Sequence, residues 1–372
     1  MKTPDQLHAE HLDRVNKALR FQEVDRPPIN LNGGVVMNNY MGVPYSDLEK
    51  DTLNANIKCL LGYLLLGKGE IDSGTIANFP PRREASYLMK LPGRELPENV
   101  LWQILEVEIM TTDDYDFIID NGHAAFDKIY AERLAALSYD GKAAERIREA
   151  APALKQIEEY RRAVGIAQLS DLMLGASAPF SGRRSFPKYM VDLHKIPDKV
   201  HAAQEVYFEE GFPKWVQMVR AVKEEVPCIQ TGGGNVHISP KLFERFSLPY
   251  VIKVLKMIFE EGKIAHMHND SNWDDYIQRY YLEYYPKGCL LELDGTSNIF
   301  KAREHLGDHM SIMGDVPDWM LAFESAETTY NYVRRLVNEI GPKGYIVSSG
   351  CGAPPNSKFD NYEAMILAAQ GK

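Results

Sequence analysis

The chain alternates short apolar runs with helix-like stretches, and this alternation is the feature that most constrains its fold. Each run ends in a polar residue or glycine, which is typical of a strand leaving a sheet. Eight strands are predicted, ending at or near Gly33, Asp120, Asp171, Thr231, His268, Asp294, Asp315 and Ser349. Helices are predicted between the later strands, at 241–261, 272–285, 317–323 and 325–340. Such alternation favours parallel strands, so we predict an α/β fold of the (β/α)8 TIM-barrel type.

The rest of the sequence adds helices to this barrel. Residues 5–21 predict an amphipathic helix, with leucine and valine at helical spacing, inside an N-terminal helical extension over 1–25. Residues 123–164 are charged and helical, and we expect them to form an excursion outside the barrel. Because no linker or repeat interrupts the chain, a single domain over 1–372 is expected.

The chemistry of the chain is concentrated at His266-Met267-His268 and at Cys351, each at the end of a predicted strand. Residues two apart in a strand point to the same face, so both histidines can reach one ion. Two imidazoles and one thiolate are three zinc ligands, which leave a fourth position open. The pattern therefore predicts a catalytic zinc site formed by His266, His268 and Cys351.

Composition limits the partners and the compartment. The net charge of −10 argues against nucleic-acid and acidic-membrane binding, and favours a small molecule or another protein. Four cysteines without paired spacing fit a reducing cytoplasm. The polar amino terminus does not resemble a signal peptide, and no apolar run approaches the ~18 residues of a membrane span. A cytoplasmic location is expected.

Several motifs lie in a familiar order along the chain. They are Asp25-Arg26-Pro27-Pro28, Ala178-Pro179-Phe180, the Ser-Pro-Lys-Leu-Phe segment at 239–250, Met313-Gly314-Asp315-Val316, and the Ser-Gly-Cys-Gly segment at 349–355. In these motifs the chain resembles the uroporphyrinogen decarboxylase superfamily and, within it, the corrinoid-dependent methyltransferase branch. The resemblance implies a (β/α)8 barrel, in agreement with the strand count.

The segment after the first predicted strand differs from that of the decarboxylases. The resemblance implies an arginine-containing loop there, which engages the carboxylates of the porphyrinogen. Residues 32–40 read Asn-Gly-Gly-Val-Val-Met-Asn-Asn-Tyr and contain no arginine. Because guanidinium is the natural bidentate partner of carboxylate, decarboxylation of an anionic tetrapyrrole is disfavoured.

In the methyltransferase branch, zinc is held by a His-X-Cys pair and by a distal cysteine in a Gly-Cys-Gly turn. The matching positions are His266 and Cys351, while His268 stands where the branch has cysteine. Exchange of a thiolate for a neutral imidazole removes one negative charge, so the zinc should be a stronger Lewis acid. This difference favours O-demethylation, in which a methyl group moves from a methoxylated aromatic to the cob(I)alamin of a separate corrinoid protein.

Further residues are assigned supporting positions. Asp270, Asp294 or Asp315 could orient a ligand imidazole, or could merely cap a strand end. An apolar pocket for the aromatic ring could be lined by Tyr40, Met37, Phe180, Trp273 and Met310.

Three alternatives stay open at this point. The enzyme could move a methyl group in the other direction, from a methyl-corrinoid protein to a thiol or a pterin. It could be a decarboxylase without metal. It could also be a non-catalytic barrel that only docks a corrinoid protein.

Overall fold

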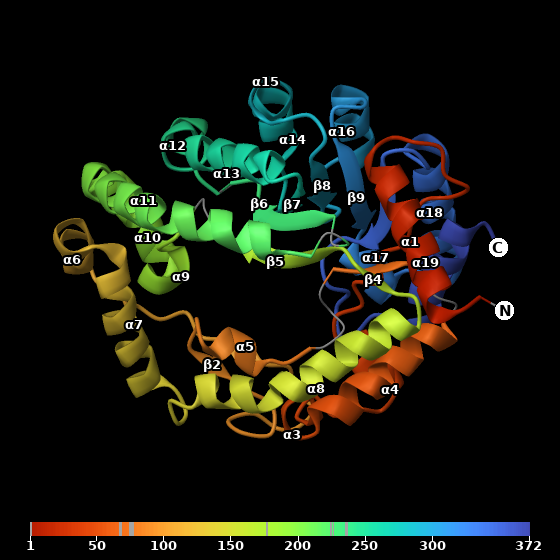
Figure 1. Cartoon of the computed structure of the whole chain (residues 1–372), viewed down its shortest axis with the longest axis horizontal. Coiled ribbons are helices and arrows are strands. Elements are labelled where there is room, and N and C mark those ends of the chain that lie inside the picture. The colour runs from red at the N-terminus through yellow and green to blue at the C-terminus, as the bar shows by residue number, and fades with distance from the viewer. Residues whose placement is uncertain are drawn as a thin grey trace.

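The computed structural model of the chain describes residues 2–66, 69–73, 78–175, 178–223, 225, 227–234 and 237–372. Its centre is a set of parallel strands surrounded by helices (Figure 1). The central strands are β1 (Ile71–Asp72), β4 (Ala167–Gln168), β5 (Ser170–Leu174), β6 (Cys228–Gly232), β7 (Ile264–Asn269), β8 (Leu290–Leu293), β9 (Ser311–Val316) and β10 (Tyr345–Ser349). A separate antiparallel pair is formed by β2 (Met89–Lys90) and β3 (Gln103–Ile104).

Hydrogen bonds close these strands into a barrel. Six of them form one parallel sheet in the order β10-β9-β8-β7-β6-β5, and β4, which leads into β5, pairs with β1. The gap between β1 and β10 is filled by Ile29 and Asn30, which form parallel bridges with Val347 and Ile71 respectively. With β4 and β5 taken as one strand, the described residues thus close a ring of eight. The predicted (β/α)8 barrel is confirmed.

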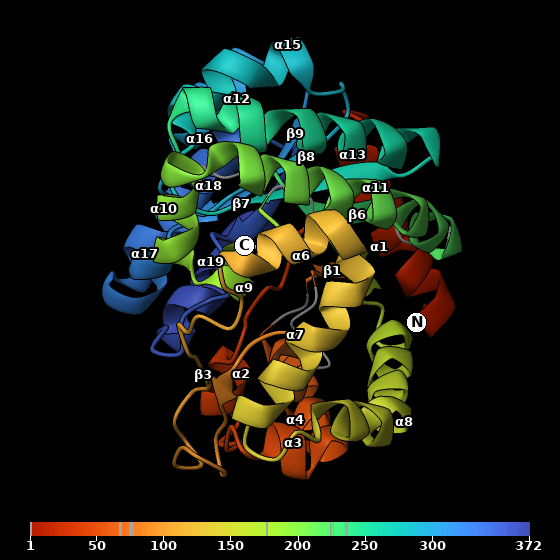
Figure 2. The same cartoon turned by 90° about the vertical axis from the view of Figure 1, so that its left-hand side faces the viewer.

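Helices lie around the ring, as two perpendicular views show (Figures 1 and 2). Those before β6 are α1 (Pro4–Leu19), α2 (Val36–Tyr40), α3 (Asp47–Lys50), α4 (Thr52–Leu65), α5 (Pro81–Glu84), α6 (Asp113–Asn121), α7 (His123–Leu137), α8 (Ala143–Ala163), α9 (Ser181–Arg184), α10 (Phe186–Lys195) and α11 (Pro197–Ala221). Those after β6 are α12 (Pro240–Phe246), α13 (Leu248–Glu260), α14 (Asp274–Tyr276), the π-helix η1 (Ile277–Tyr281), α15 (Leu282–Tyr284), α16 (Ile299–Leu306), α17 (Asp318–Phe323), α18 (Ala326–Glu339) and α19 (Phe359–Gln370). In the described part of the chain, none of these helices has the length and apolar character needed to cross a membrane. In both views α3, α4, α7 and α8 extend below the strands (Figures 1 and 2).

One of the eight predicted strands is wrong, and one strand of the ring was not predicted. The run that ends at Asp120 belongs to helix α6, in which Tyr115 and Ile118 are buried at helical spacing and Ile119 is exposed. The strand missing from the prediction is β1, which has only two residues and therefore carries too little pattern to be recognised. The later strands agree with the prediction to within a few residues of each end.

The predicted N-terminal helix is part of the barrel core. Thr3 caps α1 with a capping box that includes Gln6. Val15 and Leu19 of this helix are buried in one apolar cluster with inward side chains from the strands, among them Ile264 of β7. Since these residues lie at or near the amino ends of the strands, α1 closes the barrel at that end, and the opposite end carries the polar strand termini.

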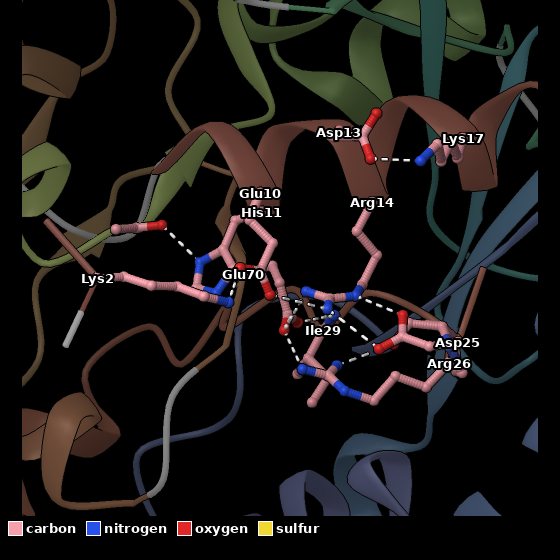
Figure 3. Close-up of polar contacts among 12 residues, drawn as sticks. Lys2, Glu10, His11, Asp13, Arg14, Lys17, Asp25, Arg26, Ile29 and Glu70 are labelled. Carbon is pink, nitrogen blue, oxygen red and sulfur yellow. Dashed lines mark hydrogen bonds and ion pairs between the residues drawn. The ribbon is translucent and has the colours of Figure 1, made fainter. Parts of the chain in front are cut away.

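A buried carboxylate ties α1 to the first strands of the ring. Glu70, which is 1% exposed, accepts a hydrogen bond from the backbone N–H of Ile29 at 2.9 Å. Its other oxygen pairs with Arg26 and with Arg14, whose Nη1 lies 3.4 Å away. Arg14 also binds Asp25 (Figure 3). Two guanidinium groups thus compensate one charge that is removed from water.

We expect the substitution Glu70→Gln to lower the free energy of unfolding by roughly 2–3 kcal/mol, because two partly buried guanidinium groups lose their shared carboxylate. Equilibrium denaturation in urea, followed by circular dichroism, measures this change. The matched control is Asp13→Asn on the exposed side of α1, where Asp13 pairs with Lys17 at 2.6 Å. Its effect should stay within about 0.5 kcal/mol, and equal effects of the two substitutions would contradict the role of Glu70.

Candidate metal centre at the barrel mouth

Strands β7 and β8 turn polar side chains into the barrel. Ile264 belongs to the inner apolar cluster, so His266 and His268, two and four residues later, share its inward face. The same alternation in β8 places Glu292 on the face of Leu290, which is also in the inner cluster. The register pairs His268 with Glu292. These three polar side chains therefore meet inside the barrel, near its carboxyl end.

Glu292 lies between the two histidines. Its Oε2 atom is 2.8 Å from Nε2 of His266 and 2.5 Å from Nδ1 of His268, and its side chain is 2% exposed. Burial alone would raise the pKa of this carboxyl, but the charge of His266 and the hydrogen bonds from both rings lower the pKa to about 2. Glu292 was not among the predicted site residues. The sequence feature that could have identified Glu292 is a single acidic residue at an inward position of an otherwise apolar strand.

His266 is buried completely and bound on both sides. Its Nε2 faces Glu292, and its Nδ1 lies 3.0 Å from the hydroxyl of Ser170 at the start of β5. An ionised carboxylate can only accept, so Nε2 carries a proton and donates to Glu292, while Nδ1 shares a hydrogen bond with the hydroxyl of Ser170. Both ring nitrogens are therefore occupied, and His266 does not join the group of side chains that could hold a metal ion. A ligand role of His266 therefore stays a prediction from the sequence.

A group of three potential ligands gathers around the outer nitrogen of His268. Nε2 of this ring lies 3.3 Å from Oδ1 of Asp270 and 3.8 Å from Sγ of Cys351. One ligand atom from each of the three residues lies within 4.8 Å of the others. His268 and Cys351 were predicted together, whereas Asp270 was expected to stand behind a ligand. In the structure Asp270 takes the place expected for His266.

The fold presents Cys351 to this group through a tight contact between strand ends. Gly350 lies against the backbone of Asp294, where an added Cβ would come within 2.2 Å of the carbonyl oxygen, so a side chain would displace the turn. The carbonyl of Cys351 accepts hydrogen bonds from Asn32 and Ser349, both at 2.7 Å. Asn32 follows the bridging residues Ile29 and Asn30, so segments from opposite ends of the chain hold this turn together.

Asp294 and Trp273, both predicted as supporting residues, shape the loop that carries Asp270. The indole N–H of Trp273 donates to the backbone carbonyl of Asp270 at 2.8 Å. The carboxylate of Asp294 accepts from the backbone of Ser271 at 2.6 Å and from Thr296. Asp294 therefore caps the loop backbone, which was the second possibility considered for it. No imidazole contact of Asp294 occurs among the described residues.

Two further acids lie close to the mouth. Asp315 is 2% exposed, and burial raises its pKa to about 7, although its Oδ1 atom accepts a hydrogen bond from Tyr332 at 2.8 Å. It orients neither histidine. Asp318, at the start of α17, escaped the prediction: burial raises its pKa to about 6, and it forms a hydrogen bond with the backbone of Cys351. The charges of Asp270 and Asp294 act on Asp318 as well, so the mouth is acidic.

The residues expected to line an aromatic pocket belong to separate parts of the fold. Met37 is buried beside α4, and Phe180 packs edge-on against Tyr115. Tyr40 is 44% exposed and stacks on Phe359. Met310 precedes β9 and so lies at the amino end of the barrel, away from the mouth. Of the five, Trp273 alone contacts the candidate centre.

The other cysteines differ from Cys351 in their surroundings. All four are free thiols, and Cys351 is the one that is partly exposed. Burial raises the pKa of Cys59 to about 12 and the pKa values of Cys228 and Cys289 further. These three remain protonated small apolar residues, so Cys351 is the thiol suited to bind a metal ion.

Metal content can decide between the ligand sets. Wild-type protein, purified without a metal-binding tag, should carry about one zinc per chain, and His268→Ala, Cys351→Ala and Asp270→Ala should lose most of it. Mass spectrometry of the metal in each preparation gives the answer. Asp275→Ala is the control, because this exposed acid lies near the group but outside it. Zinc retained by Asp270→Ala but lost from His266→Ala would restore the set predicted from sequence.

The raised pKa of Asp315 predicts a dependence of stability on pH. Its pKa of about 7 in the fold exceeds its ordinary value of 3.8, so the folded chain holds a proton that the unfolded chain releases. The contribution to stability is present below pH 3.8 and is lost as the pH rises to about 7. Asp315→Asn stays neutral and should therefore gain stability over wild type across this range. Urea midpoints at pH 5, 6, 7 and 8 measure the gain, while an unchanged difference at every pH, as expected for the exposed Asp275→Asn, would contradict it.

Comparison with known proteins identifies the family. The family profile described as uroporphyrinogen decarboxylase (URO-D) matches residues 176–371. Curated relatives include the uroporphyrinogen decarboxylases of Ovis aries (25% identical over 186 residues) and Alkalilimnicola ehrlichii (26% over 184 residues). These matches cover 47% of this chain and 48% and 46% of the two relatives, so the chain spans about half the length of the curated relatives it matches.

A solved methyltransferase from Methanosarcina mazei is similar over the whole fold. The TM-score is 0.68 at 17% sequence identity, with 100% of this chain and 99% of that chain covered. At this identity the likeness concerns the fold, and it supports the barrel described above. The sequence profile, in contrast, covers more than half of the residues, from the loop after β5 to the end of α19. This chain therefore belongs to the uroporphyrinogen decarboxylase family, a family of enzymes.

Proposed function

We propose that this protein is a zinc-dependent methyltransferase that takes a methyl group from a methoxylated aromatic and passes it to the cob(I)alamin of a separate corrinoid protein. The observation that carries the proposal is the group formed by His268, Asp270 and Cys351 at the barrel mouth. The methyltransferase from Methanosarcina mazei, which has the same fold, adds support.

The donor atoms suit zinc. Nitrogen, oxygen and sulfur are its usual protein ligands, and zinc–ligand bonds of ~2.0–2.3 Å place tetrahedral neighbours roughly 3.3–3.6 Å apart. The separations of 3.3 Å and 3.8 Å measured from Nε2 of His268 are close to this range. Three protein ligands leave a fourth position for substrate. A zinc ion held there would supply a Lewis acid for the oxygen that leaves with the electron pair of the broken methyl–oxygen bond.

The change of ligand set alters the charge argument made from sequence. His266, His268 and Cys351 would carry one negative charge, whereas His268, Asp270 and Cys351 carry two, as a histidine with two thiolates does. Because the last two of these ligand sets have equal charge, the difference between them lies in the donor atom, which is an oxygen of Asp270 in place of a second sulfur. A carboxylate oxygen is a harder donor than a thiolate sulfur, and this difference is what now favours an oxygen-containing methyl donor over a thiol.

The orientation of the His268 ring is set by Glu292, which is in turn held by His266 and Ser170. Glu292 accepts a hydrogen bond from Nδ1 of His268, so the ring directs Nε2 toward Asp270 and Cys351. Burial alone would lower the pKa of His268, but hydrogen bonds with Asp270, Cys351 and Glu292 raise it. His266 and Ser170 complete the hydrogen bonds of Glu292 and keep its charge in place. These contacts fix the direction of the ring before any ligand arrives.

Charge at the mouth disfavours the decarboxylase alternative. Asp270, Asp294 and Asp318 lie near enough to influence one another, and the loop over residues 32–40 brings no arginine to the turn of Cys351 that Asn32 contacts. A substrate with many carboxylates would meet like charge without a bidentate partner. A neutral methoxyaromatic does not suffer this repulsion, and a metal cation is attracted.

The reverse transfer, from a methyl-corrinoid protein to a thiol or a pterin, remains the second candidate, since the same group could bind a thiolate. Substrate tests separate the two directions. A docking barrel without activity would keep its affinity for the corrinoid protein after all three ligands are replaced.

Single-turnover transfer tests the proposal directly. The chain is mixed with reduced corrinoid protein and a series of methoxyaromatics, and formation of methylcobalamin is followed by absorbance. Wild type should react, and Cys351→Ala should lose at least about 100-fold in rate while it keeps its fold, because the oxygen loses its Lewis acid.

His268→Cys separates metal binding from reactivity. It should keep zinc but react about tenfold more slowly, because an added thiolate lowers the Lewis acidity of the ion. Asp275→Asn serves as the control with unchanged rate. Full turnover by Cys351→Ala would refute the zinc mechanism, and reaction with thiols alone would favour the reverse transfer.

A further inference from the structure

A second polar site lies at the opposite end of the barrel from the candidate metal centre. A cavity of about 170 Å³ is bounded by α1, by the last turns of α8 and by the start of β4. Its volume corresponds to about six water molecules at ~30 Å³ each. Among the residues that line it are His8, Arg161 and Gln168.

Arg161 is a buried cation that has no counter-charge among the described residues. The residue is 8% exposed, its Nη2 donates to Gln168 at 2.9 Å, and its Nη1 is buried without a partner. Among the described residues no carboxylate pairs with it. A buried guanidinium that lacks an anion is costly, because its hydration is lost without compensation.

His8 supplies a second buried donor to the same cavity. Burial, and then the charge of Arg162, lower the pKa of His8, so its ring is neutral near pH 7. Its Nε2 lies 3.3 Å from Nη1 of Arg162. A guanidinium can only donate, so Nε2 accepts and the proton resides on Nδ1. That Nδ1–H is buried and has no partner. Two residues that line the cavity therefore each have a buried donor without a partner among the described residues, and one of these donors is charged.

The other charges around the cavity leave room for an anion. Arg162 pairs with Glu225 at 2.6 Å, and Lys155 lies 4.0 Å from Glu159. Of the remaining lining charges, Arg161 and Lys223 are positive and Glu158 is negative. A water molecule could accept both free hydrogen bonds, but it would not compensate the charge of Arg161. An oxyanion does both.

We propose that this cavity binds a small oxyanion through Nη1 of Arg161 and Nδ1 of His8. The ligand class is phosphate, sulfate or a small carboxylate, since each offers oxygen atoms that accept from a guanidinium and an imidazole N–H. The site lies at the amino end of the barrel, so it is separate from the proposed methyl transfer and does not depend on it.

Calorimetric titration of the full chain tests the site. Inorganic phosphate, sulfate and acetate are titrated separately in an oxyanion-free chloride buffer, with sodium chloride at matched ionic strength as the blank. We expect saturable binding of at least one of them by wild type, and the strongest ligand identifies the class. Arg161→Gln should weaken that binding at least about tenfold, because a charge-assisted hydrogen bond is lost.

Two controls make the result specific. Arg220→Gln removes an exposed arginine that pairs with Glu261 outside the cavity, and its affinity should equal that of wild type. His8→Ala offers a second test if Arg161→Gln fails to fold, and it too should bind more weakly. Absence of saturable binding to all three oxyanions, or equal affinity of wild type and both cavity variants, would overturn the proposal.

Discussion

The carboxylate of Glu292 is the constraint on which the candidate site depends. It is held in the barrel interior by two histidines from the neighbouring strand and remains ionised there. Because one oxygen accepts from both rings, each ring is held in a single orientation. His266 thereby stays in the interior, while the outer nitrogen of His268 faces Asp270 and Cys351. Without this charge, the turn of Cys351 and the loop of Asp270 would meet an imidazole of undefined direction.

The barrel was largely predictable from the sequence, whereas the contacts inside it were only partly so. Apolar runs that alternate with helices give parallel strands, and the polar residue at each strand end marks the mouth. The pattern failed where it was short or ambiguous: β1 has two residues, and the run before Asp120 is apolar enough for a strand but buries a helical face.

The differences between the predicted site and the observed arrangement have a common physical cause. Strand periodicity places His266 and His268 on one face, but it does not show that their depth in the barrel differs, so only His268 reaches Cys351. The partners of each ring come from other strands: Ser170 from β5 and Glu292 from β8. Such neighbours depend on register, which the sequence alone does not provide. The residues expected to line one aromatic pocket lie apart for the same reason, because the presence of aromatic and methionine residues in a sequence does not show where each one packs.

The exposure of Asp270 has a consequence for exchange. Of the three grouped side chains, His268 is held from behind by Glu292, and Cys351 is fixed by a turn that two strands clamp. Asp270 has a side chain that is 61% exposed. A metal ion bound by this group would thus have two firm ligands and one that can swing into solvent. Dissociation of the outer carboxylate would then open a coordination position, so that an ion or a substrate could exchange without any movement of the barrel strands.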